Sequence, residues 1–174
     1  SIARMAGTSE SQLIKHFGGK ASLLDAIFVD GWNTLTNWLQ QQLPNTISPV
    51  ERLRMIPRLM FDALKRDPEL RQLLLLEGRR IRKEGRIATL TDGFLGFVKL
   101  VDSTINEMKT AGELRHDLNA QAIRSALIGL TEGALRDQLL AERAGNPADF
   151  TPENIGSLVD ALVDSVSVRP AAAA

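Results

Sequence analysis

Helix start and stop signals recur along the whole chain, and they constrain its fold more than any other feature. Residues 48–51 (Ser-Pro-Val-Glu) combine an N-cap serine, a proline at the first helical position and a glutamate that can close a capping box. Residues 67–69 and 151–153 repeat the cap followed by a proline. Gly112 and Gly145 stand where a helix can end in the left-handed conformation that glycine adopts easily. These signals divide the chain into helical segments with short connections.

The segments between the signals are rich in alanine, leucine, arginine, glutamate and glutamine, which favour helix. No long alternation of apolar and polar residues, the pattern of a half-buried strand, interrupts them. The sequence therefore predicts an all-α fold. We expect helices at residues 1–6, 9–17, 20–43, 49–66, 68–84, 91–111, 119–144 and 152–167.

The composition limits the chemistry that the chain can perform. The 174 residues include no cysteine and only two histidines, His16 and His116, which argues against thiol catalysis and against a cysteine- or histidine-rich metal site. No phosphate-binding loop, paired-carboxylate motif or H-E-x-x-H motif is present, and no nucleophile-elbow sequence accompanies His116 and Asp117 as a hydrolytic triad would require. We expect no enzyme activity, no metal and no cofactor.

Charge and hydropathy limit the partners. The 21 basic and 21 acidic residues give a formal net charge of zero, so any contact with nucleic acid must be local. The basic run at residues 79–86 lacks interleaved aromatics and is interpreted as a solvated helix end, with an acidic ligand as the alternative. The longest aliphatic run, residues 73–76, is far shorter than the ~20 residues of a membrane span, and no leader pattern opens the sequence. We expect a cytoplasmic protein with no membrane partner.

The first 24 residues carry the clearest functional pattern. Ala3 and Ala6 are small enough for two helices to cross closely, and the glycine that follows can supply the positive φ of a tight turn. The next helix can begin at an N-cap, Ser9, and its buried stripe would be Leu13 and Phe17, four residues apart. This arrangement predicts a helix-turn-helix.

These residues resemble the pattern of the tetracycline-repressor-type (TetR) family of bacterial transcription regulators, roughly I-A-x-x-A-G-V-S-x-x-x-L-Y-x-H-F-x-x-K-x-x-L. The matching positions are Ile2, Ala3, Ala6, Gly7, Ser9, Leu13, His16, Phe17, Lys20 and Leu23. The turn at residues 111–118 is similar to one found before the last two helices of such regulators.

The resemblance implies an N-terminal helix-turn-helix lobe joined by a long helix to a C-terminal helical lobe for ligand binding and dimerisation. We assign residues 1–43 to the DNA-binding lobe with its connecting helix, 44–168 to the second lobe and 169–174 to a disordered tail. The family pattern also includes a helix, and often a basic arm, before the position of Ser1, so we expect that this part is missing.

The exposed side of the predicted 9–17 helix defines a DNA-contact set. Its members are Ser9, Ser11, Gln12, Lys15, His16 and Lys20. Gln12 can bond adenine in the major groove, or it can fold back onto the Ser9 amide in a capping box. For His16 the alternative is a packing histidine, and for Lys20 an ordinary solvated lysine.

Two positions depart from the family pattern in the same region. Ile14 replaces the usual tyrosine that grips backbone phosphate, and Glu10 places a carboxylate where a neutral or basic residue is more common. Both changes weaken the attraction for phosphate.

Large apolar side chains in the middle of the chain are candidates for an effector cavity. The predicted lining residues are Trp38, Met60, Phe61, Leu64, Leu74, Phe94, Phe97 and Val101. Aromatic rings and adaptable methionines suit a small, mainly apolar molecule, and the alternative for each residue is a packed core.

The last two predicted helices carry wide apolar stripes at three- and four-residue intervals, typical of helices that pack on their own lobe and on a partner. The predicted dimer contacts are Ile123, Leu127, Leu130, Ala134, Leu158, Leu162 and Val166. Two-fold pairing would also place two helix-turn-helix units on one DNA duplex.

Together these features predict a TetR-like transcription regulator whose partners are a double-stranded DNA operator, a second copy of itself and a small hydrophobic effector. We expect a repressor that the effector releases from its operator. The alternative is a helical small-molecule carrier or sensor that keeps the helix-turn-helix fold but does not bind DNA productively.

Overall fold

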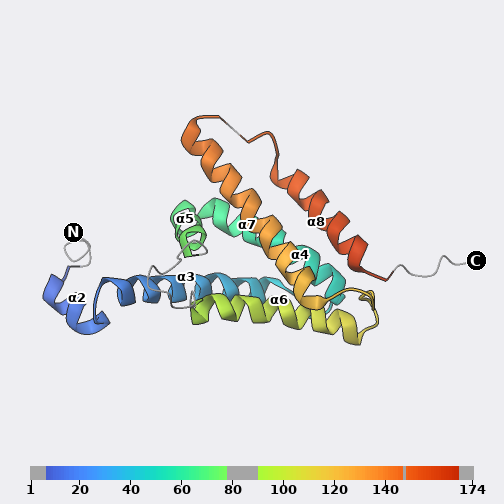
Figure 1. Cartoon of the computed structure of the whole chain (residues 1–174), viewed down its shortest axis with the longest axis horizontal. Helices are drawn as coiled ribbons and strands as arrows, with labels where there is room; N and C mark the ends of the chain where they lie inside the picture. Colours follow the sequence, from blue (N-terminus) through green and yellow to red (C-terminus); the bar gives the residue numbers. More distant parts are fainter. Residues whose placement is uncertain (1–6, 78–89, 147, 169–174) are drawn as a thin grey trace, which may run out of the picture.

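A computed structural model describes residues 7–77, 90–146 and 148–168, and this part of the chain folds into seven helices (Figure 1). They are α2 (Glu10–Phe17), α3 (Lys20–Gln42), α4 (Pro49–Arg66), α5 (Pro68–Glu77), α6 (Asp92–Thr110), α7 (Ala120–Ala144) and α8 (Pro152–Val166). The all-α prediction is confirmed. The expected helix at 1–6, the part of the 68–84 helix beyond residue 77 and the tail lie outside the described residues.

Side-chain caps place the helix ends close to the predicted positions. The Ser48 hydroxyl accepts a hydrogen bond of 3.2 Å from the Glu51 amide at the start of α4. The Glu51 carboxylate lies 3.2 Å from Arg54 Nε, so it forms an ion pair there. Thr151 opens α8 with a reciprocal capping box, and Gly145 ends α7 at a φ of 71°. Local hydrogen bonds therefore set these boundaries.

The helices form an elongated molecule with α2 at one end. α3 and α6 run side by side along its length, and α2 projects beyond the body next to the first turns of α3 (Figure 1). α7 and α8 form an antiparallel pair, and α4 contacts both of them as well as α3 and α6. The body is thus a helical bundle with the short helix α2 outside it.

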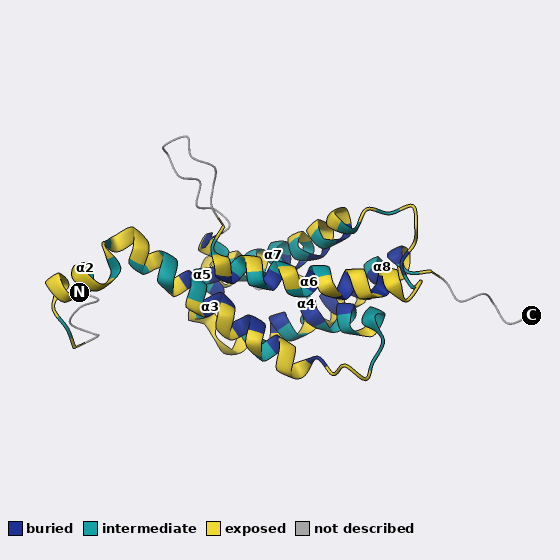
Figure 2. Ribbon diagram, turned by 90° about the horizontal axis from the view of Figure 1, so that it is seen from below, coloured by how far each residue is buried: buried dark blue, intermediate teal, exposed yellow. Residues whose placement is uncertain are grey.

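Burial changes along α3. Its first three residues, 20–22, are exposed, whereas Phe28 is completely buried, and the helix turns from yellow to dark blue toward the body in Figure 2. The centre of the core includes Leu39, Ile105 and Met108, each fully buried. One continuous helix therefore extends from the solvent-exposed end of the molecule into its core.

The connection between α6 and α7 is tied to the end of α8. The Arg115 amide donates to the Val166 carbonyl at 3.0 Å, and an isolated antiparallel bridge pairs Leu114 with Ser167. The Arg115 guanidinium donates to both Asp117 oxygens, at 3.1 and 2.6 Å, which lowers the pKa of Asp117. This pairing indicates a structural role for Asp117.

Within the described ranges, no helix combines the length and the apolar character that crossing a bilayer requires.

Candidate functional site

Helix α2 presents an open polar side to solvent. The predicted DNA-contact residues Ser9, Ser11, Gln12, Lys15, His16 and Lys20 are all exposed. Leu13 and Phe17 are half-buried, and α2 contacts α3. The short helix is therefore seated along its apolar stripe, and its opposite side is free to meet a large partner.

Gln12 takes the folded-back conformation. The backbone amide of Gln12 donates to the Ser9 hydroxyl at 3.2 Å. Its side-chain oxygen accepts from the Ser9 backbone amide at 3.3 Å and from the Thr8 hydroxyl at 2.6 Å. The carbonyl oxygen is occupied by the cap, so a bidentate contact with adenine would require the side chain to leave it. Ser11 and Lys15 are the more available groups on this side.

The neighbours of Gln12 add both apolar and basic character. Ile14 is 61 % exposed, and the His16 ring packs edge-on against Phe17 with ring centroids 4.6 Å apart. His16 thus combines a packing contact with an exposed position.

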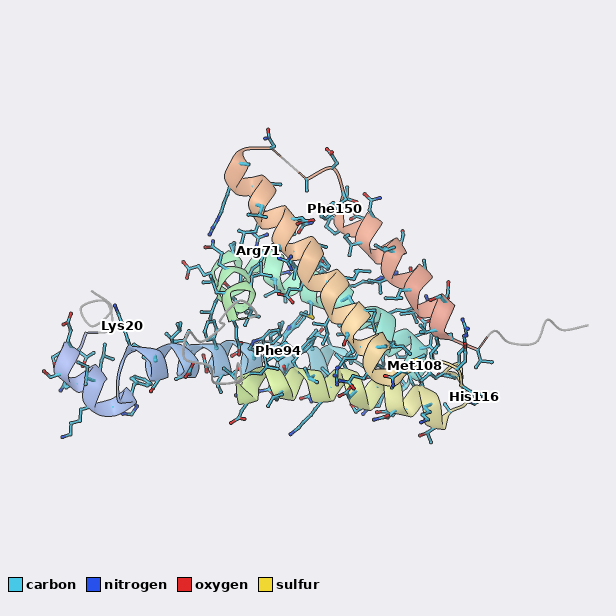
Figure 3. The ribbon with its side chains drawn as sticks, in the orientation of Figure 1. Lys20, Arg71, Phe94, Met108, His116 and Phe150 are labelled. Carbon is cyan, nitrogen blue, oxygen red and sulfur yellow. The ribbon has the colours of Figure 1, made fainter. Side chains whose placement is uncertain are left out.

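The start of α3 has an uncapped backbone. Its N-cap is Gly19, which offers no side-chain acceptor, and Lys20 follows as an exposed first residue, labelled at the α2 end in Figure 3. The free amides of a helix N-terminus and an adjacent lysine both favour an anion.

A mainly apolar cavity lies in the body, walled by α3, α4, α5, α6 and α7. Six of the eight predicted residues line it: Met60, Leu64, Leu74, Phe94, Phe97 and Val101. Its volume is about 70 Å³, which is small beside the several hundred Å³ of typical ligand pockets. A drug-sized ligand would therefore have to push the surrounding helices apart.

Two predicted cavity residues lie elsewhere. Trp38 is half-buried and packs against the core, away from the cavity. Phe61 is 5 % exposed and faces a separate groove between α4 and α8, beside Pro152 and Ile155. Phe61 follows the lining residue Met60 by one position, which is about 100° further around α4, and apolar content alone does not reveal which of the two faces the cavity.

Sequence reasoning missed the polar part of the cavity wall. Trp32, Arg71, Glu77, Thr131 and Glu132 all line it. Arg71 and Glu77 are 6 % and 8 % exposed, respectively, although charged residues seldom lie inside a protein unless they are paired. The available signal was their place on the two sides of the Leu73–Leu76 run in a short helix.

The buried charges have specific partners. Both terminal nitrogens of Arg71 donate to the Glu142 carboxylate on α7, at 3.0 and 2.5 Å. Glu77 accepts from Trp32 Nε1 at 2.5 Å and from the Thr91 amide at 3.1 Å. These bonds connect the cavity wall to α3, α6 and α7.

The predicted dimer contacts divide between two faces. Ile123, Leu127, Ala134 and Val166 are only 3 to 8 % exposed and belong to the chain's own core, so they are not available to a partner. Leu158 is 52 % exposed, and Leu130 and Leu162 are half-buried. The stripes were wide because they include both faces, and only the packed structure separates the two.

Fold and sites together define a class of protein: a helical body with an apolar cavity, joined by one long helix to a small exposed helix whose residues fit the helix-turn-helix pattern. Residues 28–143 match the family described as YsiA-like protein, C-terminal region (TetR_C_4). The chain therefore belongs to the TetR family of transcription regulators. The match begins at Phe28, the residue at which α3 enters the core.

Individual relatives agree with this assignment. The nucleoid occlusion factor SlmA of Marinomonas sp. (strain MWYL1) is 24 % identical over 156 residues, which are 88 % of this chain and 78 % of that protein. FadR from Bacillus subtilis, solved in complex with stearoyl-CoA, superposes with a TM-score of 0.75 at 17 % identity, covering 94 % of this chain and 83 % of that one. FadR from Bacillus halodurans gives the same TM-score at 19 % identity, with 93 % and 81 % covered. These findings favour the regulator over the carrier interpretation.

Proposed function

We propose that this regulator binds operator DNA as a two-fold dimer through the open side of α2, and that a mainly apolar effector in the cavity releases it, so that it acts as a repressor. The observation that carries the proposal is α3, which begins beside α2 at exposed Lys20 and contributes Trp32 to the cavity wall. One helix therefore touches both sites.

The DNA contact combines base and phosphate recognition. Ser11, on the open side of α2, reaches base edges in the groove, while Lys15, Lys20 and the free amides at the start of α3 suit backbone phosphates. Gln12 contributes mainly by holding the first turn of α2 in place.

Dimerisation uses the outer face of α7 and α8, on which Leu158, Leu162 and Leu130 are the apolar contacts. Gly129 and Gly133 lie on the outer side of α7, and a Cβ added at either position meets no atom of this chain within 4 Å. Glycines with open space in a long helix permit close approach of a partner helix.

The effector site is supported by the apolar lining and by the similarity to FadR, which was solved with stearoyl-CoA. Because the cavity is small, a ligand must displace Trp32 or its neighbours, and α3 moves with Trp32. A coupling of about 1–3 kcal/mol would lower operator affinity roughly 5- to 150-fold.

The test is binding of the full-length protein to DNA upstream of its own gene across a salt series, with and without acyl-CoA thioesters of different chain length. A regulator shows a steep fall of log affinity with log salt, and an effector weakens the binding. A flat salt response would favour the carrier.

A further inference from the structure

One residue that lines the cavity carries a buried hydrogen-bond donor without a partner. Arg71 is 6 % exposed and lines the cavity, and its Nε is buried with no acceptor within reach in the described structure. A buried N–H of a charged group that bonds to nothing is costly, because it has lost its hydration. Among the buried unpartnered polar atoms of the described residues, it alone belongs to a lining residue.

The other two nitrogens of Arg71 are already used. Both donate to the Glu142 carboxylate, a bidentate pair that fixes the plane of the guanidinium between α5 and α7. The Nε–H lies on a different edge of the guanidinium from the one that faces Glu142, so it cannot join the same pair. Arg71 is labelled on α5 in Figure 3, in the part of the body that faces α7.

The charges around the cavity decide which acceptor suits this donor. Glu142 neutralises Arg71, and Glu132, also in the wall, has Arg136 at 3.9 Å. Glu77 contributes a further buried carboxylate whose partners are the neutral donors Trp32 and Thr91. Among the described groups the wall and its partners therefore carry a net negative charge, which opposes a carboxylate ligand.

We propose that the effector carries a neutral carbonyl oxygen that accepts a hydrogen bond from Arg71 Nε, with an aliphatic chain lying along Met60, Phe97 and Val101. Ketones, esters, thioesters and amides with such a chain form the ligand class. The inference rests on the proposed function of the cavity as the effector site and adds the polar end of the ligand.

The test compares three ten-carbon probes: 2-decanone, decane and decanoate. The affinity of each probe is measured by its displacement of the fluorescent dye N-phenyl-1-naphthylamine from the full-length protein. Titration calorimetry checks the binding of 2-decanone directly. We expect 2-decanone to bind about tenfold or more tightly than decane, because it alone satisfies the Nε–H without adding charge. Decanoate should bind more weakly than 2-decanone.

Two variants that break the same ion pair separate recognition from stability. Arg71→Met removes the Nε–H, so the preference for 2-decanone over decane should disappear. Glu142→Gln keeps the Nε–H but leaves Arg71 uncompensated, so that preference should persist while decanoate gains affinity relative to 2-decanone. Arg143→Met removes an exposed positive charge next to Glu142, together with the hydrogen bond of 2.9 Å from Arg143 to Gln72, but it leaves Arg71 and Glu142 in place and should change neither ratio.

The outcomes distinguish the role of Arg71 from the proposed function of the cavity as the effector site. Equal binding of 2-decanone and decane to the unmodified protein, preference for decanoate, or an unchanged ketone preference in Arg71→Met would overturn the role of Arg71 while leaving the cavity as the effector site. If neither the dye nor any of the three probes binds, both the effector cavity and the carbonyl contact are wrong. Should Arg71→Met fail to fold, the probe ranking on the unmodified protein and on Glu142→Gln still decides.

Discussion

The indole Nε1 of Trp32 donates a hydrogen bond of 2.5 Å to the buried carboxylate of Glu77. The second oxygen of Glu77 accepts from the amide of Thr91, the N-cap of α6, at 3.1 Å. The Trp32 ring also stacks on Phe97 with centroids 5.1 Å apart. One carboxylate therefore joins the middle of α3 to the end of α5 and the start of α6, beside the cavity.

Replacing Trp32 with phenylalanine tests this junction. The variant keeps an aromatic ring against Phe97 but leaves one Glu77 oxygen buried without a donor, which should lower the free energy of unfolding by about 1–3 kcal/mol. Chemical denaturation measures the loss. Trp38→Phe is the matched control, because Trp38 is half-buried and lies outside the cavity wall. Equal losses in the two variants would argue that Glu77 contributes nothing specific.

The Trp32→Phe variant should also respond less to effector. Its operator affinity without ligand should stay close to that of the unmodified protein, because the α2 surface is unchanged, while the drop in affinity on adding effector becomes smaller. Fluorescence anisotropy of labelled operator DNA measures both values. An undiminished effector response would show that α3 is coupled to the cavity by another route.

Lys15→Ala should weaken operator binding without altering stability, because its side chain is exposed on the open side of α2. The slope of log affinity against log salt should shrink by about two for a dimer, one for each lost phosphate contact. Lys109→Ala removes an exposed lysine in the last turn of α6 and should leave the slope unchanged. Helix α6 ends at the opposite end of the body from α2 (Figure 1). A matching loss for both lysines would indicate a general charge effect and count against α2 as the DNA reader.

Leu158→Glu should dissociate the dimer while leaving the protomer folded. The side chain is 52 % exposed within the chain, so a charge there costs the protomer little but is buried in the proposed interface. We expect the dimer dissociation constant to rise about 30-fold or more, measured by analytical ultracentrifugation. Leu95→Glu, at an exposed leucine of α6, is the control and should remain dimeric. A Leu158→Glu variant that remains dimeric would show that the interface lies elsewhere.

Gly133→Ala separates protomer stability from association. Nothing lies within 4 Å of a Cβ at this position, so in the monomeric Leu158→Glu background alanine should stabilise the protomer by about 0.5–1 kcal/mol through helix propensity. In the otherwise unmodified dimer the same methyl group should weaken association, because a partner helix packs there. Stability measured in the two backgrounds should therefore change in opposite directions. Stabilisation in both would mean that no partner approaches Gly133.

Helix positions were predictable because their causes are local. The Ser48 cap, the Thr151 cap and the glycine at the end of α7 each act on residues a few positions away. Apart from the end of α5, beyond which the chain is not described, the helix boundaries lie within one residue of those predicted. The exposed side of α2 was predictable from Leu13 and Phe17 for the same reason, because the side opposite the apolar stripe of an amphipathic helix faces solvent.

The cavity was predictable only in part. Met60, Leu64 and Phe97 line it, but Phe61 and Trp38 do not, because the rotation of each helix about its axis depends on what packs against it. The predicted dimer contacts include Ile123, Leu127, Ala134 and Val166, which are buried in the chain's own core, because apolar periodicity does not distinguish a core face from a partner face.

By itself the sequence determined an all-helical chain, the places where its helices begin and end, and the side of α2 that is exposed to solvent, all of which depend on interactions between near neighbours. Only the tertiary structure decided which apolar residues enclose the cavity, that Trp32 meets Glu77 and that Arg71 meets Glu142. Those contacts join residues 45 and 71 positions apart, respectively, and they form only when separate helices pack together and exclude water.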